Sequence, residues 1–287
     1  PMGVFAGTTT DCNGGDNCSE HVAAIGTTHY DTLQEAVDAA GTEGIANTIT
    51  LVKNVELTET LNLNKNIILD LNGYKISNCE SSNNTSYLVK VNNDADVSIV
   101  GNKEGSEIHD SRSNPKGTIT AICVLGKLTV KGDGLKIFRG QNGIAIKVDE
   151  GIKQGELVVE SGEISSTQAI QNWGISTIKG GVFKGKVNCY AYGNTGGKLT
   201  INNGVFEEQV YSAQLKYDGS WPTVSAKTSI AGGSFKKEVA EYYDDGTNGV
   251  QPVTRVDKPN EASESEVTAT GGTFSDLSAL DYLGDNA

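Results

Sequence analysis

The feature that most limits how this chain can fold is a repeat, Gly-Gly-x-Phe, in its second half. The motif occurs at residues 180–183, 232–235 and 271–274, with the variant Asn-Gly-Val-Phe at residues 203–206. A short β-prone run precedes each copy. Self-similarity at periods of about 20–50 residues is typical of solenoids. The repeat therefore predicts that successive turns of the chain stack on one another.

A column of apolar residues extends this repeat toward the N-terminus, where isoleucine replaces phenylalanine. Its members are Ile76, Ile108, Ile137, Ile164, Phe183, Phe206, Phe235 and Phe274. Neighbouring members are 19 to 39 residues apart, so the strand runs stay alike while the loops absorb the differences in length. This behaviour indicates a parallel β-helix, whose strands stack coil on coil. We expect the glycines at the corners, where positive φ carries no Cβ penalty, and the following Phe or Ile inside.

A second series of strand-like runs alternates with the first. It comprises residues 122–126, 144–148, 169–174 and 187–193. Each coil therefore carries at least two strands on different faces, and the predicted fold class is all-β, a parallel β-helix solenoid.

The organisation predicted along the chain is one domain with closed ends. Residues 1–21 are expected to be irregular, and residues 22–287 to form a single β-helix domain. Apolar residues recur at helical spacing over 32–40, with Asp31 or Thr32 as N-cap and Gly41 as the stop, which predicts a capping helix over the first coil. Residues 275–283 are expected to close the other end. The polar stretch 244–266 matches no repeat and predicts a projecting loop or hairpin.

The charge balance excludes several classes of partner. The chain has 36 acidic and 23 basic residues, a net charge of −13, and no apolar run of the length that a membrane helix needs. Such a surface repels phosphate backbones and anionic lipid, so we expect neither nucleic-acid binding nor membrane insertion. The start at Pro1-Met2-Gly3 lacks the regions of a signal peptide and suggests a mature or partial chain.

Five cysteines fall into two groups. Cys12 and Cys18 bracket a flexible loop that a disulfide can close, which would favour an extracellular location. With His21 and His29 nearby, a zinc site is the alternative, although the spacing matches no familiar zinc signature. The others are expected to be small buried core residues: Cys79, Cys123 and Cys189.

Three segments resemble a known family. The opening at residues 24–40, the run at 67–76 and the closing Gly-Gly-Ser-Phe at 232–235, with Val239 and Tyr242, resemble β-helical repeat domains in large surface proteins of gut Gram-positive bacteria. The resemblance covers residues 22–283. It implies a right-handed, pectin-lyase-like β-helix on the bacterial cell surface, and an adhesin or a glycan-associated module.

Scaffolds of this kind also carry polysaccharide lyases and glycoside hydrolases, so we looked for catalytic groups. Arg112 and Arg139 lack the constellation of acids that a lyase site needs, and we expect both to be solvated loop cations. Carboxylate pairs such as Asp94 with Asp96 lie in turn-like stretches, where Asp commonly bonds its own backbone. No catalytic residue, metal or cofactor is predicted.

The favoured candidate site is a group of aromatic residues within about two and a half predicted coils. Exposed aromatic rings offer flat platforms for sugars or contact points for a protein. The alternative is that some of them point inward or cover a loop. The group comprises Trp173, Tyr190, Tyr192, Tyr217 and Trp221, with Tyr211 among them.

The sequence therefore predicts a non-catalytic, cell-surface binding or adhesin module that contacts a host or bacterial glycan or glycoprotein. A carbohydrate-active enzyme on the same scaffold and a purely structural spacer are the alternatives.

Overall fold

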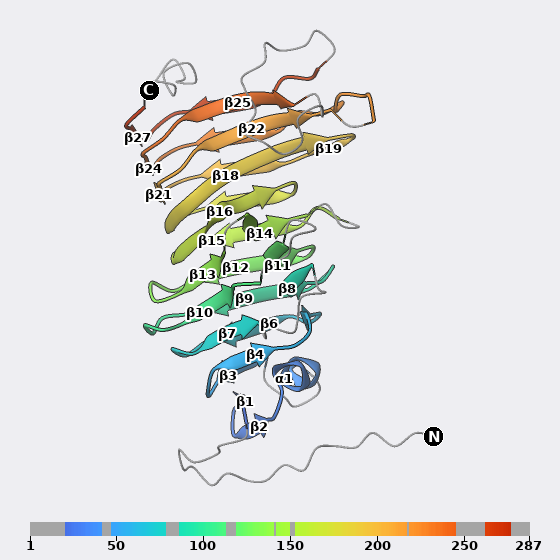
Figure 1. The fold of residues 1–287 in the computed structure, drawn as a ribbon, viewed down its shortest axis with the longest axis vertical. Helices are drawn as coiled ribbons and strands as arrows, with labels where there is room; N and C mark the ends of the chain where they lie inside the picture. Colours follow the sequence, from blue (N-terminus) through green and yellow to red (C-terminus); the bar gives the residue numbers. More distant parts are fainter. Residues whose placement is uncertain are drawn as a thin grey trace.

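The structure is a computed structural model that describes residues 21–41, 47–78, 86–112, 119–140, 142–149, 153–216, 218–244 and 262–276. Within these ranges the chain forms strands in two long sheets and one helix, so the predicted all-β class is confirmed. The strands rise in chain order along an elongated stack (Figure 1).

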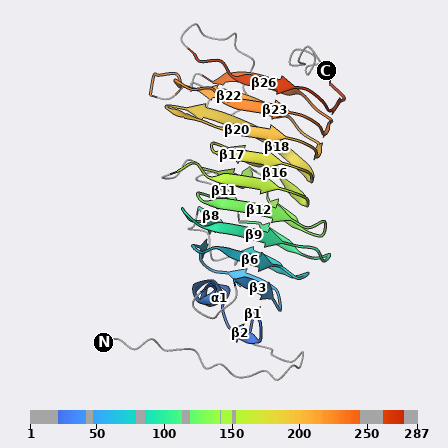
Figure 2. The same cartoon turned by 180° about the vertical axis from the view of Figure 1, so that it is seen from behind.

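The first sheet has 11 strands and forms one face of the stack (Figure 2). Its strands are parallel from β3 onward, and each pairs with the strand contributed by the preceding turn. In spatial order they are β2 (Thr28–Tyr30), β1 (Ala23–Ile25), β3 (Thr48–Leu51), β6 (Ile67–Asp70), β9 (Asp96–Val100), β12 (Lys127–Lys131), β15 (Glu156–Val159), β17 (Ile175–Ile178), β20 (Lys198–Ile201), β23 (Lys227–Ile230) and β26 (Glu266–Ala269).

The second sheet has 16 strands arranged in two columns, which two long strands bridge. The phenylalanine column contains β4 (Val55–Leu57), β7 (Lys75–Asn78), β10 (Glu107–Asp110), β13 (Lys136–Arg139), the first parts of β16 (Glu163–Asn172) and β18 (Val182–Tyr192), β21 (Val205–Phe206), β24 (Ser234–Phe235) and β27 (Thr273–Phe274). The tyrosine column contains β5 (Leu61–Leu63), β8 (Tyr87–Val91), β11 (Ile119–Val124), β14 (Gly143–Val148), the second parts of β16 and β18, β22 (Val210–Leu215) and β25 (Val239–Asp244). The short β19 (Thr195–Gly196) pairs antiparallel with the end of β18.

The predicted apolar column is confirmed residue by residue. The register of the phenylalanine column joins all eight predicted positions, from Ile76 to Phe274, in one row. The rings of Phe183, Phe206, Phe235 and Phe274 stack nearly parallel, with centroids 4.8, 4.7 and 4.8 Å apart. This spacing equals the distance between neighbouring strands, so the ladder itself dictates the stack.

The corner glycines are required by backbone conformation and by space. Gly233 has φ +112, and a Cβ there would lie 3.1 Å from the Gly204 carbonyl oxygen and 3.3 Å from ring atoms of Phe206 and Phe235. Only glycine adopts such a φ at little cost. The repeat therefore encodes a corner followed by an inward ring.

The N-terminal end is closed by a hairpin and the helix. Strands β1 and β2 pair antiparallel, and β1 runs antiparallel to β3 across the first edge of the 11-stranded sheet. Helix α1 (Leu33–Ala39) begins at a capping box in which Thr32 and Glu35 exchange hydrogen bonds. Its buried residues are Leu33, Ala36 and Val37, as the 32–40 pattern predicted.

The interior turns polar toward the C-terminus. The inward row that begins with Leu63 and Val91 continues as Asn172, Cys189 and Ser212. The Asn172 amide donates to the Lys198 carbonyl oxygen at 3.0 Å and accepts from the Ser176 hydroxyl at 2.7 Å. Ser212 bonds the Thr228 hydroxyl at 2.7 Å and the Glu266 carbonyl oxygen at 3.2 Å. These side chains satisfy backbone groups where one turn passes into the next.

Several expectations fall on residues that the structure does not describe. Residues 1–20, most of the expected 244–266 loop and most of the expected 275–283 cap are among them. So are three of the cysteines: Cys12, Cys18 and Cys79.

Candidate functional site

Aromatic side chains gather on the outer side of the tyrosine column. Along the second part of β18, Val187, Cys189 and Ala191 belong to the core, while Tyr190 belongs to a separate apolar cluster. Side chains alternate between the two faces of a strand, so Tyr190 and Tyr192 share the outer side. The register then places Ala213 of β22 and Tyr242 of β25 in the same outer row as Tyr190.

Five rings form one continuous group, which we call the aromatic face: Trp173, Tyr190, Tyr192, Tyr211 and Tyr242. Trp173 lies 4.8 Å from Tyr190, at an interplanar angle of 34°, and 6.0 Å from Tyr192 at 90°. Tyr211 meets Tyr190 at 6.0 Å and Tyr242 at 5.0 Å, both at 74°. Most contacts are therefore edge to face, a favourable arrangement for aromatic pairs.

Burial divides the aromatic face into a base and an accessible part. Tyr190, Tyr211 and Tyr242 are 2%, 8% and 6% exposed. Trp173 and Tyr192 are only half-buried. The rings that a ligand can reach are thus Trp173 and Tyr192, and the three buried tyrosines support them.

The hydroxyl groups of the base are tied into a polar network. The Tyr190 and Tyr211 hydroxyl oxygens lie 2.9 Å apart, and the Asn188 amide donates to Tyr211 at 3.4 Å. The Tyr242 hydroxyl donates to a Glu238 carboxylate oxygen at 2.7 Å. Two buried polar atoms in this region have no hydrogen-bond partner within the described part of the chain: Trp173 Nε1 and Asn188 Oδ1.

Two tyrosines of the base, Tyr190 and Tyr211, have raised pKa values. Burial raises the pKa of Tyr190 well above its ordinary value, and the neighbouring Tyr211 adds to the shift. Burial also raises the pKa of Tyr211, although hydrogen bonds from Tyr190 and Asn188 oppose it. A neutral phenol with a raised pKa is a poor general base, so these residues are suited to packing and hydrogen bonding.

The structure brings together four of the six aromatic residues predicted to group, namely Trp173, Tyr190, Tyr192 and Tyr211. Trp221 lies elsewhere, with its ring 6.2 Å from Tyr243 and 5.7 Å from the Lys216 ammonium group. The sixth, Tyr217, lies outside the described residues.

Tyr242 was not among the predicted site residues, although a signal for it exists. It stands three positions after the inward Val239, as Tyr190 stands three positions after the inward Val187. Aligning the strands of the tyrosine column by their inward valines therefore finds it.

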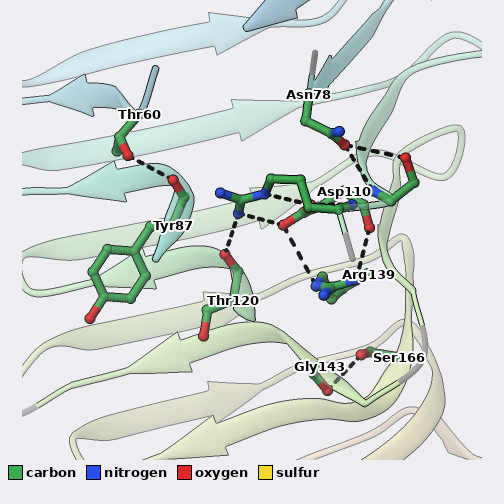
Figure 3. A network of polar contacts seen from close by, with 10 residues as sticks. Thr60, Asn78, Tyr87, Asp110, Thr120, Arg139, Gly143 and Ser166 are labelled. Carbon is green, nitrogen blue, oxygen red and sulfur yellow. Dashed lines mark hydrogen bonds and ion pairs between the residues drawn. The ribbon is translucent and has the colours of Figure 1, made fainter. Parts of the chain in front are cut away.

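Arg112 and Arg139 are not solvated loop cations, which corrects the expectation from the sequence. Both are buried, at 3% and 4% exposure, beside Asp110, whose side chain is 0% exposed (Figure 3). Arg112 donates to both carboxylate oxygens of Asp110, at 2.8 and 2.7 Å. Arg139 Nε lies 3.7 Å from the same carboxylate, and burial lowers the pKa of its guanidinium. Gly143 makes room for Arg139, because a Cβ there would lie 2.6 Å from its Cγ.

The acids considered for catalysis pair with lysines. Asp94 contacts Lys153 at 2.7 Å, and Asp96 contacts Lys127 at 3.3 Å. Both pairs are largely exposed, which leaves these carboxylates in the ordinary environment of surface acids.

The described residues contain no group of three or more His, Cys, Asp or Glu side chains that would hold a metal. His21 bonds Asp31 at 2.5 Å, and its ring meets that of His29 at 5.6 Å. Cys123 and Cys189 are buried, as predicted; both are free thiols, and burial raises their pKa values to about 11 and about 12. In the described part of the chain, no helix has both the length and the apolar character that crossing a bilayer requires.

Comparison of the chain with protein-family models, with curated proteins and with solved structures finds no match in any of the three.

Proposed function

We propose that this chain is a non-catalytic binding module, built on a right-handed parallel β-helix, that presents its aromatic face to a glycan or glycoprotein. The observation that carries the proposal is the half-buried pair Trp173 and Tyr192, whose rings stand perpendicular, 6.0 Å apart, on a base of buried tyrosines. The two perpendicular rings present two apolar surfaces to a ligand. The buried tyrosines hold them in place, so little side-chain ordering is needed on binding.

The β-helix part of the proposal rests on strand order. Each turn places one strand in the 11-stranded sheet, one in the phenylalanine column and one in the tyrosine column, and then returns to the first sheet. The connection between parallel strands of one sheet is right-handed in about 98% of cases. A scaffold of this kind is rigid along its length, because every turn packs on both of its neighbours.

The chemistry of the aromatic face favours a neutral partner with hydroxyl groups. The polar groups around the rings are the amides of Gln168, Asn188 and Gln209, the tyrosine hydroxyls and the carboxylate of Glu238. Amides and hydroxyls both donate and accept hydrogen bonds, and so match a polyol. The net charge of −13 works against polyanionic glycans.

A bacterial cell-surface location is part of the proposal. It is supported by the resemblance of residues 22–283 to repeat domains of surface proteins. An adhesin role toward a host or bacterial glycan follows from that setting.

The test is a glycan and glycoprotein array probed with the whole chain and with two variants, Trp173→Ala and Tyr192→Ala. Truncating a ring that forms a central contact weakens binding about tenfold or more. Phe138→Ala is the matched control, because Phe138 is a half-buried ring on the outer side of the phenylalanine column, stacked on His109 at 4.6 Å. We expect the control to bind like the wild type.

Three results would overturn the proposal. Unchanged binding by both variants would exclude the aromatic face as the binding site. Absence of any bound glycan or glycoprotein would favour a role as a structural spacer. Release of unsaturated or reducing sugar ends from a polysaccharide panel would instead identify a carbohydrate-active enzyme.

A further inference from the structure

The three strand columns are not closed equally at the N-terminal end. The hairpin β1–β2 covers the first edge of the 11-stranded sheet. The edge of the tyrosine column is covered by helix α1, whose Gln34 donates to the Asn62 carbonyl oxygen at 3.1 Å and accepts from the Asn62 amide at 3.0 Å. In the described part of the chain, β4 of the phenylalanine column pairs with β7 alone.

The free edge of β4 presents a backbone donor. Glu56 is the first residue of a row that runs across the phenylalanine column, and its neighbour in β7 is Ser77. In later turns the backbone amides of this row donate to the preceding turn. The Glu207 amide donates to the Phe183 carbonyl oxygen at 3.0 Å, and the Lys236 amide to the Phe206 carbonyl oxygen at 2.9 Å. The Glu56 amide therefore points away from β7, toward the N-terminal end, where the described residues offer it no strand.

A groove of about 550 Å³ runs along this edge. Its apolar lining includes Leu33 and Leu61, which are 2% exposed, and Val55, the first residue of the inward column, which is 6% exposed. Its carboxylates are Asp31, Asp38, Glu56 and Glu59, all on exposed residues. Among the described residues, neither lysine nor arginine lines it. Glu56 and Glu59 form no ion pair within the described chain.

We propose that this groove binds an extended, lysine- or arginine-bearing peptide segment of a partner protein, which adds to β4 as one more strand of the phenylalanine column. Three features support the same occupant: a free strand edge, an apolar floor and a rim of carboxylates alone. Strand addition supplies main-chain hydrogen bonds, and the alternate side chains of the added strand supply specificity. Its apolar side chains lie over Val55 and its basic side chains meet Glu56 and Glu59. This site is at the opposite end of the stack from the aromatic face and is independent of it.

The test measures fluorescence anisotropy of labelled peptides with the whole chain. The probe is an acetylated and amidated Val-Lys-Val-Lys-Val-Lys peptide. Two further peptides separate charge from strand pairing: the Val-Glu counterpart, and the lysine peptide with alternate amides N-methylated. We expect the lysine peptide to bind, and the other two to bind at least about tenfold more weakly because each lacks one of the two interactions.

Matched protein variants locate the site. The double variant Glu56→Lys and Glu59→Lys is expected to weaken binding of the lysine peptide about tenfold or more. Its control, Glu104→Lys with Asp133→Lys, makes the same change of net charge in exposed turns away from the groove. The control is expected to bind within about twofold of the wild type. Circular dichroism verifies that both double variants fold.

Three outcomes would overturn the proposal. Equal losses in the two double variants would show attraction to the acidic chain as a whole. Undiminished binding of the N-methylated peptide would exclude an added strand. No binding of the lysine peptide to the wild type would show that the groove is not a site for basic peptides.

Discussion

At the residue scale, the buried group Asp110, Arg112 and Arg139 shows most directly what holds a corner of the stack. One carboxylate faces two guanidinium groups, and all three side chains are nearly inaccessible to water. Burying charges is unfavourable unless each has partners, so the carboxylate is the element that permits both arginines to be inside.

We predict that Asp110→Asn destabilises the protein by about 3–5 kcal/mol, because it leaves two buried positive charges uncompensated. The matched control is Asp96→Asn, which breaks an exposed ion pair with Lys127 and should change stability by less than about 1 kcal/mol. Urea denaturation of the two variants measures both effects. Equal, small changes would show that the buried carboxylate contributes no more than a surface one.

The two arginines also show why sequence reasoning failed at this site. The partner of Arg112 is Asp110, two residues earlier at the end of β10, and that short spacing was a usable signal. The carboxylate near Arg139 lies 29 residues away and one turn earlier, where only the register makes them neighbours. The predicted apolar column already aligned Ile108 with Ile137, and the same register continued by two residues would have placed Asp110 beside Arg139.

At the scale of elements, the phenylalanine column is the part of the fold that the sequence predicted best. Every position from Ile76 to Phe274 was identified. Each side chain in this column stacks on the one in the next turn, so the same residue type, Ile or Phe, recurs along the sequence. The aromatic face was found only in part. Its members differ in kind from turn to turn, so the base formed by Tyr190, Tyr211 and Tyr242 emerges only once β18, β22 and β25 are aligned.

We predict that Phe206→Ala destabilises the protein by about 3–5 kcal/mol. Phe206 is fully buried, between the rings of Phe183 and Phe235, so its loss opens a cavity between two turns and breaks the stack on both sides. Thermal and chemical denaturation measure the change. Phe138→Ala removes the same ring from the outer side of the same column and serves as the reference. A loss no greater than that of the reference would contradict the stacking argument.

At the scale of the whole molecule, stability is distributed along one axis. Strand pairing joins each turn to the turns before and after it, and within the described residues the last turn, β26 and β27, is paired on one side only. The stability of a stack of repeats is approximately the sum of the stability of each turn and of each contact between neighbouring turns. The end turns therefore open more easily than the middle turns.

Hydrogen exchange should reveal this gradient. We expect the slowest amide exchange in the middle strands, such as β13, β16 and β18, and the fastest in β26 and β27 among the strands of the two sheets, because fewer interfaces must open to expose them. Exchange followed by mass spectrometry of proteolytic fragments gives the profile. Equal protection from β3 to β27 would instead show that the stack opens as a single cooperative unit.

The even pitch of the phenylalanine stack has a consequence for how such a gene can grow. Phe206 meets a phenylalanine on either side at 4.8 and 4.7 Å, and a corner glycine precedes each of the three rings. Copying the 29 residues from one phenylalanine to the next, 206 to 235, would insert a turn whose ring and corner glycine match those of the turns beside it. Unequal recombination within this stretch would therefore lengthen or shorten the protein in whole turns and keep the phenylalanine stack continuous.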